Sequence, residues 1–214
     1  MAFWKRVLRM CAGVIVYAFG VTISVQANMG IAPWDCLSMG ISYHVPFSYG
    51  TVHTVIGFLC LLTGYLMGER IGLGTILDTL IAGNAVDLFL ALNVIPKVNS
   101  PVIGAIVLIP AMFVMAFGIW MCMGAGLSCG PRDTLYVALT KRMPKLSGAA
   151  VELIMLAAVL ALGLVFGGPV GIGTVECWFG ISIAMGLVFR MMKFEPKNVR
   201  HESLTESLMR LKRK

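Results

Sequence analysis

The sequence predicts an all-α membrane protein with six transmembrane helices, arranged as two inverted repeats of three helices each. Three observations lead to this fold class: an apolar composition, six hydrophobic runs of spanning length, and an internal repeat. Hydrophobic residues make up 58% of the 214 residues and charged residues only 13%, whereas a soluble domain carries about 25% charged residues. The mean hydropathy is +0.89. A chain so poor in charge could not cover a water-exposed surface, so the lipid bilayer is its expected partner.

The hydrophobic runs have the length that a bilayer requires, which is roughly 20 apolar residues for a spanning helix. Six runs meet this length, and they cover residues 7–27, 50–68, 75–95, 102–125, 148–167 and 174–192. The first run resembles a secretory signal peptide, because basic residues precede it and Ala27 stands near its end. It is longer than the about 7–15 apolar residues of a signal core, and it has a counterpart later in the chain. We therefore expect it to be retained as the first span.

The chain aligns with itself when it is shifted by 98 residues. The matched positions are Ala18-Phe19-Gly20 with Ala116-Phe117-Gly118, Pro33 with Pro131, Asp35 with Asp133, Gly50 with Gly148 and, after a one-residue slip, Gly72, Gly74 and Thr75 with Gly171, Gly173 and Thr174. Apolar helices align with one another by chance, but Gly, Pro and Asp at loop positions in a preserved order do not. Three spans per half is an odd number, so the second half is expected to insert with the opposite orientation. Residues 1–99 and 100–192 thus form two halves of one domain, and a basic tail covers 193–214.

The distribution of Lys and Arg predicts the orientation, since cytoplasmic loops are enriched in both. With the N-terminus in the cytoplasm, 16 of the 17 Lys and Arg residues fall in cytoplasmic segments and Lys97 falls outside. Both termini are therefore expected in the cytoplasm. The same orientation puts the two Pro-x-Asp segments on opposite faces, 32–35 outside and 130–133 inside. Trp34 would then suit the headgroup interface and Arg132 the anionic inner leaflet.

Each Pro-x-Asp segment predicts a short helix, over residues 33–44 and 131–143. Proline is favoured at the first helical position, and Asp35 and Asp133 complement the positive end of the helix dipole in the first turn. Neither helix is long enough to span. Two interpretations remain open: helices that lie flat at the two interfaces, or re-entrant half-helices whose N-termini point at a central site.

The Gly-x-Gly-Thr motifs at 72–75 and 171–174 predict tight helix–helix turns, because Gly commonly ends a helix and Thr is a fair N-cap. A ligand site lined by backbone is the alternative. A nucleotide-binding loop is excluded, since the motif lacks the lysine and the strand context of a P-loop.

The residues that carry a family resemblance are Gly30-Ile31-Ala32-Pro33-Trp34-Asp35 with Gly72-Leu73-Gly74-Thr75, and Cys129-Gly130-Pro131-Arg132-Asp133 with Gly171-Ile172-Gly173-Thr174. In this order they resemble the YczE-like group of bacterial membrane proteins, which is related to the YyaS and YitT proteins. The resemblance covers about residues 10–190. It implies a multi-pass protein of the bacterial cytoplasmic membrane, and it supplies neither a substrate nor catalytic residues.

Polar and ionisable residues within the apolar runs are the candidate pathway or binding residues, because a charge in lipid costs at least ~2.5–3.5 kcal/mol. The candidates are His53, Glu152, Asp78, Glu176, Asn84 and Asp87. His53 and Glu152 hold nearly the same repeat position, and we hypothesise that they belong to a polar pathway with proton coupling. The alternative is a structural pair or a pair of hydrated groups near the interface. Asp78 and Glu176 follow the Gly-x-Gly-Thr motifs and would also serve simply to complement a helix end.

The leading functional hypothesis is a transporter or channel for a small solute or ion, because inverted repeats with half-helices are typical of transporters. This is an analogy between folds. The alternative is a non-transporting scaffold or accessory subunit of a secretion or biosynthesis system. We do not expect an enzyme, since the sequence shows no HExxH motif and no paired catalytic constellation, and we expect no metal site and no cofactor. Nucleic acid is not an expected partner, whereas a homo-oligomer remains open. The basic tail is predicted to form an amphipathic segment on the inner leaflet.

Overall fold

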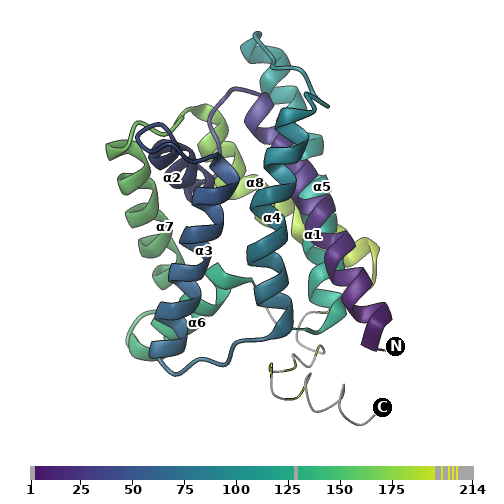
Figure 1. The fold of residues 1–214 in the computed structure, drawn as a ribbon, viewed down its shortest axis with the longest axis vertical. Helices are drawn as coiled ribbons and strands as arrows, with labels where there is room; N and C mark the ends of the chain where they lie inside the picture. The colour runs from purple at the N-terminus through teal and green to yellow at the C-terminus, as the bar shows by residue number, and fades with distance from the viewer. Residues whose placement is uncertain are drawn as a thin grey trace.

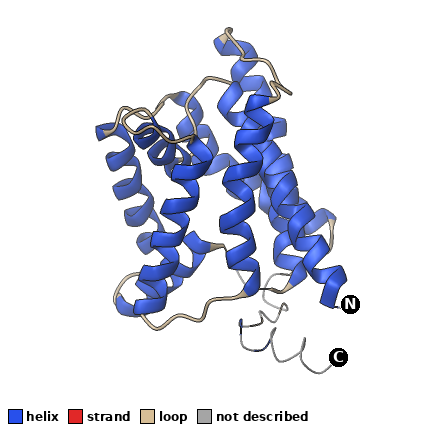
Figure 2. Cartoon of the chain, in the orientation of Figure 1, coloured by secondary structure: helices blue, strands red, loops and turns tan. Residues whose placement is uncertain are grey.

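A computed structural model describes residues 3–127, 130–195, 199, 202, 204 and 206. Over these residues the chain is all-helical, with eight helices and no strand (Figure 1, Figure 2). The helices are α1 (Phe3–Gln26), α2 (Pro33–Ser42), α3 (Tyr49–Leu66), α4 (Leu73–Ala91), α5 (Pro101–Ala125), α6 (Pro131–Arg142), α7 (Gly148–Val165) and α8 (Ile172–Met191). The predicted all-α class is confirmed.

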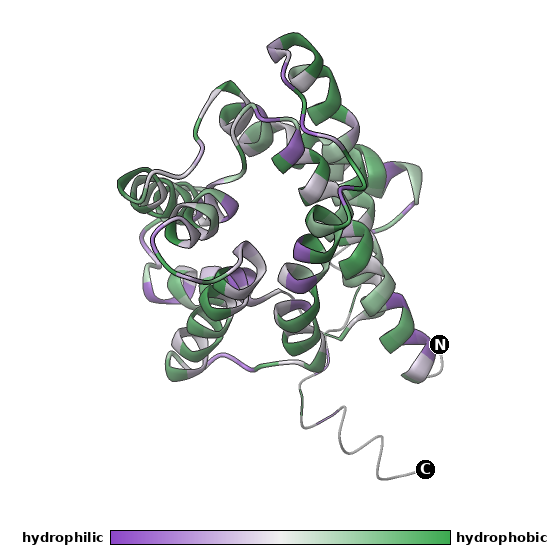
Figure 3. Cartoon of the chain, turned by 45° about the horizontal axis from the view of Figure 1, so that its top comes forward, coloured by the Kyte–Doolittle hydropathy of each residue, from purple (hydrophilic) through white to green (hydrophobic). Residues whose placement is uncertain are grey.

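Six of the helices in this described part, α1, α3, α4, α5, α7 and α8, are long and apolar enough to cross a membrane. They coincide with the six predicted runs to within a few residues. Hydrophobic residues dominate these helices in Figure 3, and large apolar side chains such as Leu62, Ile106 and Ile183 are exposed on their outer faces. Such faces are costly in water and favourable against lipid.

The two short helices start where the sequence predicts. Proline stands at the first helical positions of α2 and α6, and Asp35 and Asp133 lie in their first turns. The Asp133 carboxylate accepts a hydrogen bond from the backbone N–H of Gly130 at 3.2 Å. This bond satisfies one of the N–H groups that a helix start leaves without an intrahelical partner.

The helices that follow the two short helices, α3 and α7, both begin with a serine N-cap. The Ser48 hydroxyl accepts a hydrogen bond from the Thr51 N–H at 3.2 Å at the start of α3. The Ser147 hydroxyl accepts one from the Ala150 N–H at 3.2 Å at the start of α7. A serine cap stabilises a helix by about 1 kcal/mol. Because the two caps fix the first residue of each helix, they also define which positions of α3 and α7 correspond.

The helices form two groups. In the first, α1 and α5 cross in close contact, α4 packs on α1, and α8 packs on α5. Side chains at Gly20 or Gly118 would collide with the facing helix, at Met115 and Tyr17 respectively. Glycine therefore allows the backbones of α1 and α5 to approach, which is how helices commonly associate in lipid.

The second group contains α2, α3, α6 and α7. Here α2 packs on α7 and α3, and α6 packs on α3 and α7 (Figure 1). Gly64 in α3 faces Thr134 in α6, and Gly163 in α7 faces Cys36 in α2. The two groups are joined where α3 packs along α4, and on the other side α7 and α8 diverge.

The Gly-x-Gly-Thr motifs begin helices rather than simply joining them. Gly72 and Gly171 are the N-caps of α4 and α8. Two residues after each cap, the Gly74 N–H donates to the Leu127 carbonyl at 2.9 Å, and the Gly173 N–H donates to the Met29 carbonyl at 2.8 Å. Each motif therefore holds the loop that precedes a short helix of the other half.

Arg6, near the start of α1, connects this helix to the end of α5 and to the tail. Its guanidinium donates to the carbonyls of Ala125 and Gly126 at 2.6 and 2.7 Å, at the C-terminal end of α5, and pairs with Glu202 at 2.7 Å. The start of α1, the end of α5 and residue 202 therefore lie together. Most of the tail at 193–214, with its predicted amphipathic segment, lies outside the described residues.

Candidate functional site

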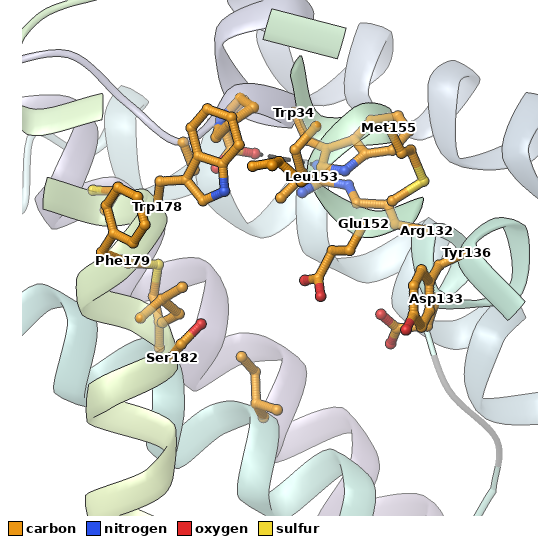
Figure 4. A pocket seen from close by; sticks show the side chains of 18 of the residues that line it. Trp34, Arg132, Asp133, Tyr136, Glu152, Leu153, Met155, Trp178, Phe179 and Ser182 are labelled. Carbon is orange, nitrogen blue, oxygen red and sulfur yellow. Dashed lines mark hydrogen bonds and ion pairs between the residues drawn. The ribbon is translucent and has the colours of Figure 1, made fainter. Parts of the chain in front are cut away.

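A cavity of about 460 Å³ lies between the two groups of helices (Figure 4). The first half of the chain contributes α1 and α2 to its lining, and the second half contributes α5, α6, α7 and α8. Its polar and aromatic lining residues are Tyr17, Trp34, Asp35, Arg132, Asp133, Tyr136, Glu152, Cys177, Trp178, Phe179 and Ser182. This volume falls in the range of small-molecule sites, roughly 300–1,000 Å³.

An ion pair joins the first turns of the two short helices. Arg132 Nη2 in α6 lies 3.2 Å from Asp35 Oδ1 in α2, and the Tyr49 hydroxyl donates to the same oxygen at 3.0 Å. The Asp35 side chain is only 5% exposed and the Arg132 side chain 20%. Burial of a lone charge is expensive, so the two charges and the tyrosine stabilise one another.

The guanidinium of Arg132 also lies over the Trp34 ring, 5.3 Å from its centroid, which is a favourable cation–π distance. These contacts correct the prediction that the two Pro-x-Asp segments lie on opposite faces, with Trp34 at headgroups and Arg132 at the inner leaflet. The prediction failed because it placed 32–35 and 130–133 at the two membrane faces, as if they were the loops between spans. In the structure the helix starts turn inward, and Asp35 and Arg132 neutralise each other there.

The depth of α6 favours the half-helix interpretation over the interfacial one. A Cβ at Gly57, in the middle of α3, would lie 3.6 Å from the Pro131 ring. At the other end of α6, Lys141 pairs with Glu69 at 2.8 Å, beyond the end of α3. The helix therefore runs from the level of the middle of a candidate span to the end of that span.

Two carboxylates point into the cavity near this ion pair. Figure 4 shows Glu152 of α7 and Asp133 of α6 on the same side of the space, with Tyr136 beside them and with Trp178 and Phe179 of α8 across it. Glu152 was predicted as a candidate residue from its position in an apolar run, and it lines the cavity.

The other candidates lie elsewhere. His53 is buried in α3, with its ring 5.7 Å from that of Tyr49, outside the cavity lining. Asp87 accepts a hydrogen bond from the Gly50 N–H at 2.8 Å, whereas the Asn84 amide donates to the Leu80 carbonyl of its own helix at 2.6 Å.

The two carboxylates that follow the Gly-x-Gly-Thr motifs are also outside the cavity lining. Asp78 lies beside Gly130 at the start of α6, and Glu176 is half-buried near the start of α8. The structure therefore gathers Asp35, Arg132 and Asp133 with Glu152 in the cavity lining. Asp78 and His53 lie next to this group, against Gly130 and Tyr49 respectively, but outside the lining.

Several lining residues were not predicted. Tyr17, Tyr136 and Trp178 lie in apolar or mixed segments where an aromatic ring gives no signal of its own, since such rings also face lipid. One usable signal existed for Arg132: it stands at the position of Trp34 in the other half, at the start of a helix that one interpretation already aimed at a central site.

In the predicted repeat the helix pair α3–α4 corresponds to the pair α7–α8, and the structure packs the two pairs differently. Gly50 and Gly83 bring α3 and α4 into backbone contact. Counted from the serine caps, which move the match of Gly50 by one residue from Gly148, the residue that corresponds to Gly50 in α7 is Ala149. Counted from the glycine caps of α4 and α8, Gly83 corresponds to Ser182. Both Ala149 and Ser182 line the cavity instead. Gly186, which corresponds to Asp87, has no atom within 4 Å of the place that a Cβ would take. The cavity therefore occupies the space that a tight α7–α8 pair would fill.

Six apolar helices of spanning length, four of which line a cavity together with the two short helices, define a polytopic helical membrane protein. The chain belongs to a family of unknown function (DUF6198), whose model matches residues 4–190. It is 28% identical over 185 residues to the "Uncharacterized membrane protein YczE" of Bacillus subtilis, covering 84% of this chain and 81% of that protein. It is 24% identical over 194 residues to the "Uncharacterized protein YyaS" of the same organism, covering 88% and 95%. An "Uncharacterized protein" of Haemophilus influenzae is 28% identical over 176 residues, covering 80% and 78%. No solved structure matches.

These comparisons confirm the resemblance that the motifs indicated. The family match spans both halves and ends before the basic tail. The relatives carry no activity in their names, so function has to be argued from the cavity itself.

Proposed function

We propose that this protein is a transporter for a small solute or ion in the bacterial cytoplasmic membrane, with the cavity as its binding site. The observation that carries the proposal is the cavity between the halves, which lies where one helix pair diverges while the corresponding pair is closed. A transporter of this kind exposes one site alternately to the two sides of the membrane.

Reciprocal contacts support an inverted repeat of the two halves. Gly20 meets Met115 and Gly118 meets Tyr17, and a shift of 98 residues converts one contact into the other. A twofold axis between two similar units produces such exchanged pairs, because residue i of one unit then meets residue j of the other and the reverse.

The loops and short helices support the same axis. The hydrogen bond from Gly173 to Met29 has its counterpart in the bond from Gly74 to Leu127, in which the halves exchange roles. The contact between Gly64 and Thr134 likewise corresponds to that between Gly163 and Cys36. In each case the two partners come from opposite halves, so a twofold axis that exchanges the halves accounts for both contacts of the pair.

The asymmetry of the helix pairs supports alternating access. The α3–α4 contact at Gly50 and Asp87 lies far from the loop joining these helices, and Ile71 of that loop accepts a hydrogen bond from Leu204 of the tail at 2.9 Å. The closed contact is therefore at the end away from the tail. The diverging part of α7 and α8, at Ala149 and Ser182, is at the tail end. Exchange of these two arrangements would open the cavity to the opposite side.

The charge distribution supports cytoplasmic termini. Removal of Arg132 from the predicted cytoplasmic group leaves 15 Lys and Arg residues there against Lys97 outside, which keeps the bias that orients membrane proteins. With this orientation, the structure corresponds to a state that is open towards the cytoplasm.

A non-transporting scaffold is the second candidate function. A scaffold is expected to have a dry core and a binding surface on the outside of the helix bundle. A cavity with charged residues from both halves favours transport over the scaffold, and over an enzyme, for which the lining offers no recognised catalytic constellation among the described residues.

The experiment uses a cysteine pair, Ala149→Cys with Ser182→Cys, in a background without the native cysteines. In proteoliposomes, each single variant should react with a membrane-impermeant maleimide from the side that carries the termini. A short bifunctional maleimide should join the pair, block this labelling and stop the flux of any transported solute in a broad screen. The single variants treated with the same reagent are the controls. Absence of labelling from both sides, together with unchanged behaviour after crosslinking, would sink the proposal.

A further inference from the structure

We infer that the cavity binds an organic cation with an apolar body; this rests on the proposed transport function for its physiological meaning. The inference concerns the chemical class of the ligand. It follows from the charges that the cavity leaves uncompensated, from the rings around them, and from the available volume.

The charges in the cavity do not balance. Arg132 is committed to Asp35, with 3.2 Å between the charged atoms, so this pair presents no net charge to a ligand. Asp133 and Glu152 remain without a basic partner, since Arg132 is the only basic side chain among the described residues that line the cavity. The bond that Asp133 accepts from the Gly130 N–H comes from an uncharged group. At a partly buried site, charges of one sign attract a ligand of the opposite sign more strongly than they do in bulk water. An anionic ligand would meet two carboxylates, which disfavours it.

Aromatic rings surround the same space. Trp178 and Phe179 of α8 stack with centroids 6.2 Å apart and an angle of 16° between the rings. Figure 4 shows them across the cavity from Glu152, with Tyr136 close to the carboxylates. The face of an indole or phenol ring attracts an ammonium group, and aromatic cages with nearby carboxylates recognise quaternary ammonium ligands. Trp34 already shows this preference, since one of its faces holds the Arg132 guanidinium.

The lining residues favour an organic cation over an inorganic one. A metal cation such as Ca²⁺ requires about six to eight oxygen ligands at close range. No group of three or more His, Cys, Asp or Glu residues that could hold a metal occurs in the part of the chain that the structure describes. Apolar lining residues such as Met155, Leu156 and Ile181 suit hydrocarbon instead. With about 460 Å³ the cavity is large enough for a small organic molecule.

The test measures binding of phenyltrimethylammonium to the purified full chain in nanodiscs by isothermal titration calorimetry. Its neutral isostere, in which carbon replaces the quaternary nitrogen, and the benzoate anion are measured in parallel. We expect the cation to bind, and both other probes to bind at least about tenfold more weakly. Equal binding of the three probes, or tighter binding of benzoate, would overturn the inference.

Glu152→Gln removes one carboxylate with little change in shape, and we expect it to weaken cation binding about tenfold. Glu69→Gln is the matched control, because Glu69 pairs with Lys141 away from the cavity, and it should leave binding unchanged. If Glu152→Gln does not elute as a monodisperse protein, Trp178→Leu provides a second variant that should weaken binding of the cation. Wild-type affinity in a folded Glu152→Gln and a folded Trp178→Leu would also overturn the inference.

The outcomes for the ligand and for transport are separable. A neutral or anionic solute whose flux stops when α7 and α8 are crosslinked would overturn the cation inference and leave the transport proposal standing. Cation binding that depends on Glu152, in a protein whose crosslinking has no effect on labelling or flux, would uphold the inference and reject alternating access.

Discussion

The buried ion pair between Arg132 and Asp35 offers the sharpest prediction about how the structure is held together. Arg132→Met removes the guanidinium but keeps a long apolar side chain that can still cover Trp34. It leaves the Asp35 carboxylate, 5% exposed, with the Tyr49 hydroxyl as the remaining partner that the structure gives it. A buried charge with its counter-charge removed is the main cost of this change, so the variant should be strongly destabilised.

The magnitude follows from the distance. Two unit charges at 3.2 Å attract by on the order of 5 kcal/mol at an effective dielectric constant of about 20. Loss of one partner of a buried pair typically costs ~3–5 kcal/mol. We expect the lower part of that range, about 3 kcal/mol, because Arg132 is 20% exposed and water can reach the carboxylate through the cavity. Tyr49→Phe removes one hydrogen bond and should cost only about 1 kcal/mol.

A double-mutant cycle distinguishes pairing from general disruption. Asp35→Asn combined with Arg132→Met removes both charges, and it should be more stable than Arg132→Met alone. The coupling free energy should be at least about 2 kcal/mol. Unfolding in mixed micelles of a mild detergent with increasing SDS, followed by circular dichroism, measures all four proteins. Additive effects of the two changes, or a cost below about 0.5 kcal/mol for Arg132→Met, would refute the reasoning.

Three further predictions concern contacts outside this pair. Gly50→Leu should destabilise the protein by more than about 2 kcal/mol, because a side chain there would collide with the backbone of Gly83; Gly186→Ala, at a position with open space around it, should unfold within about 0.5 kcal/mol of wild type in the same detergent titration. Asp87→Leu removes the acceptor of the Gly50 N–H and should cost about 1–3 kcal/mol, and an unchanged unfolding midpoint would contradict the role assigned to this bond. Arg6→Met removes the bonds that join the start of α1 to the end of α5 and to Glu202 of the tail, so the basic tail should be cleaved faster by trypsin. Equal cleavage rates would show that Arg6 does not hold the tail.

The spans could be predicted from the sequence because the bilayer imposes one simple requirement, a helix of sufficient apolar length. The starts of α2 and α6 were equally predictable, since Pro33 and Pro131 act locally through a fixed backbone angle and a missing N–H group. The serine caps of α3 and α7 are local devices of the same kind. These features depend on residues within a few positions of one another.

The centre of the site could not be predicted in this way. Asp35 and Arg132 are 97 residues apart in the chain, and no local pattern records that their helices meet. The charge rule that orients the spans counted Arg132 as a cytoplasmic residue, although its charge is in fact compensated inside the bundle. His53 and Glu152 share a repeat position, yet they lie in different surroundings, because the packing of α3 on α4 is not repeated by α7 and α8. Where the two halves differ in packing, their sequence similarity misleads.

The exchange that we propose between two arrangements would depend on the residues at the two helix pairs. The closed pair depends on Gly50, Gly83 and the hydrogen bond that Asp87 accepts. The diverging pair carries Ala149 and Ser182 at the corresponding positions, and both are small enough for α7 and α8 to approach closely. It lacks an equivalent of Asp87, since Gly186 stands there. The pair α7–α8 can therefore close, but without the bond that holds α3 to α4, which explains why the open side of the structure is the one next to α7 and α8. Gly186→Asp would supply the missing carboxylate. It should shift the exchange towards closure of α7 and α8, and the measurement is protection of Ser182→Cys from the membrane-impermeant maleimide. Unchanged labelling in a folded Gly186→Asp variant would show that this bond does not set the balance between the two arrangements.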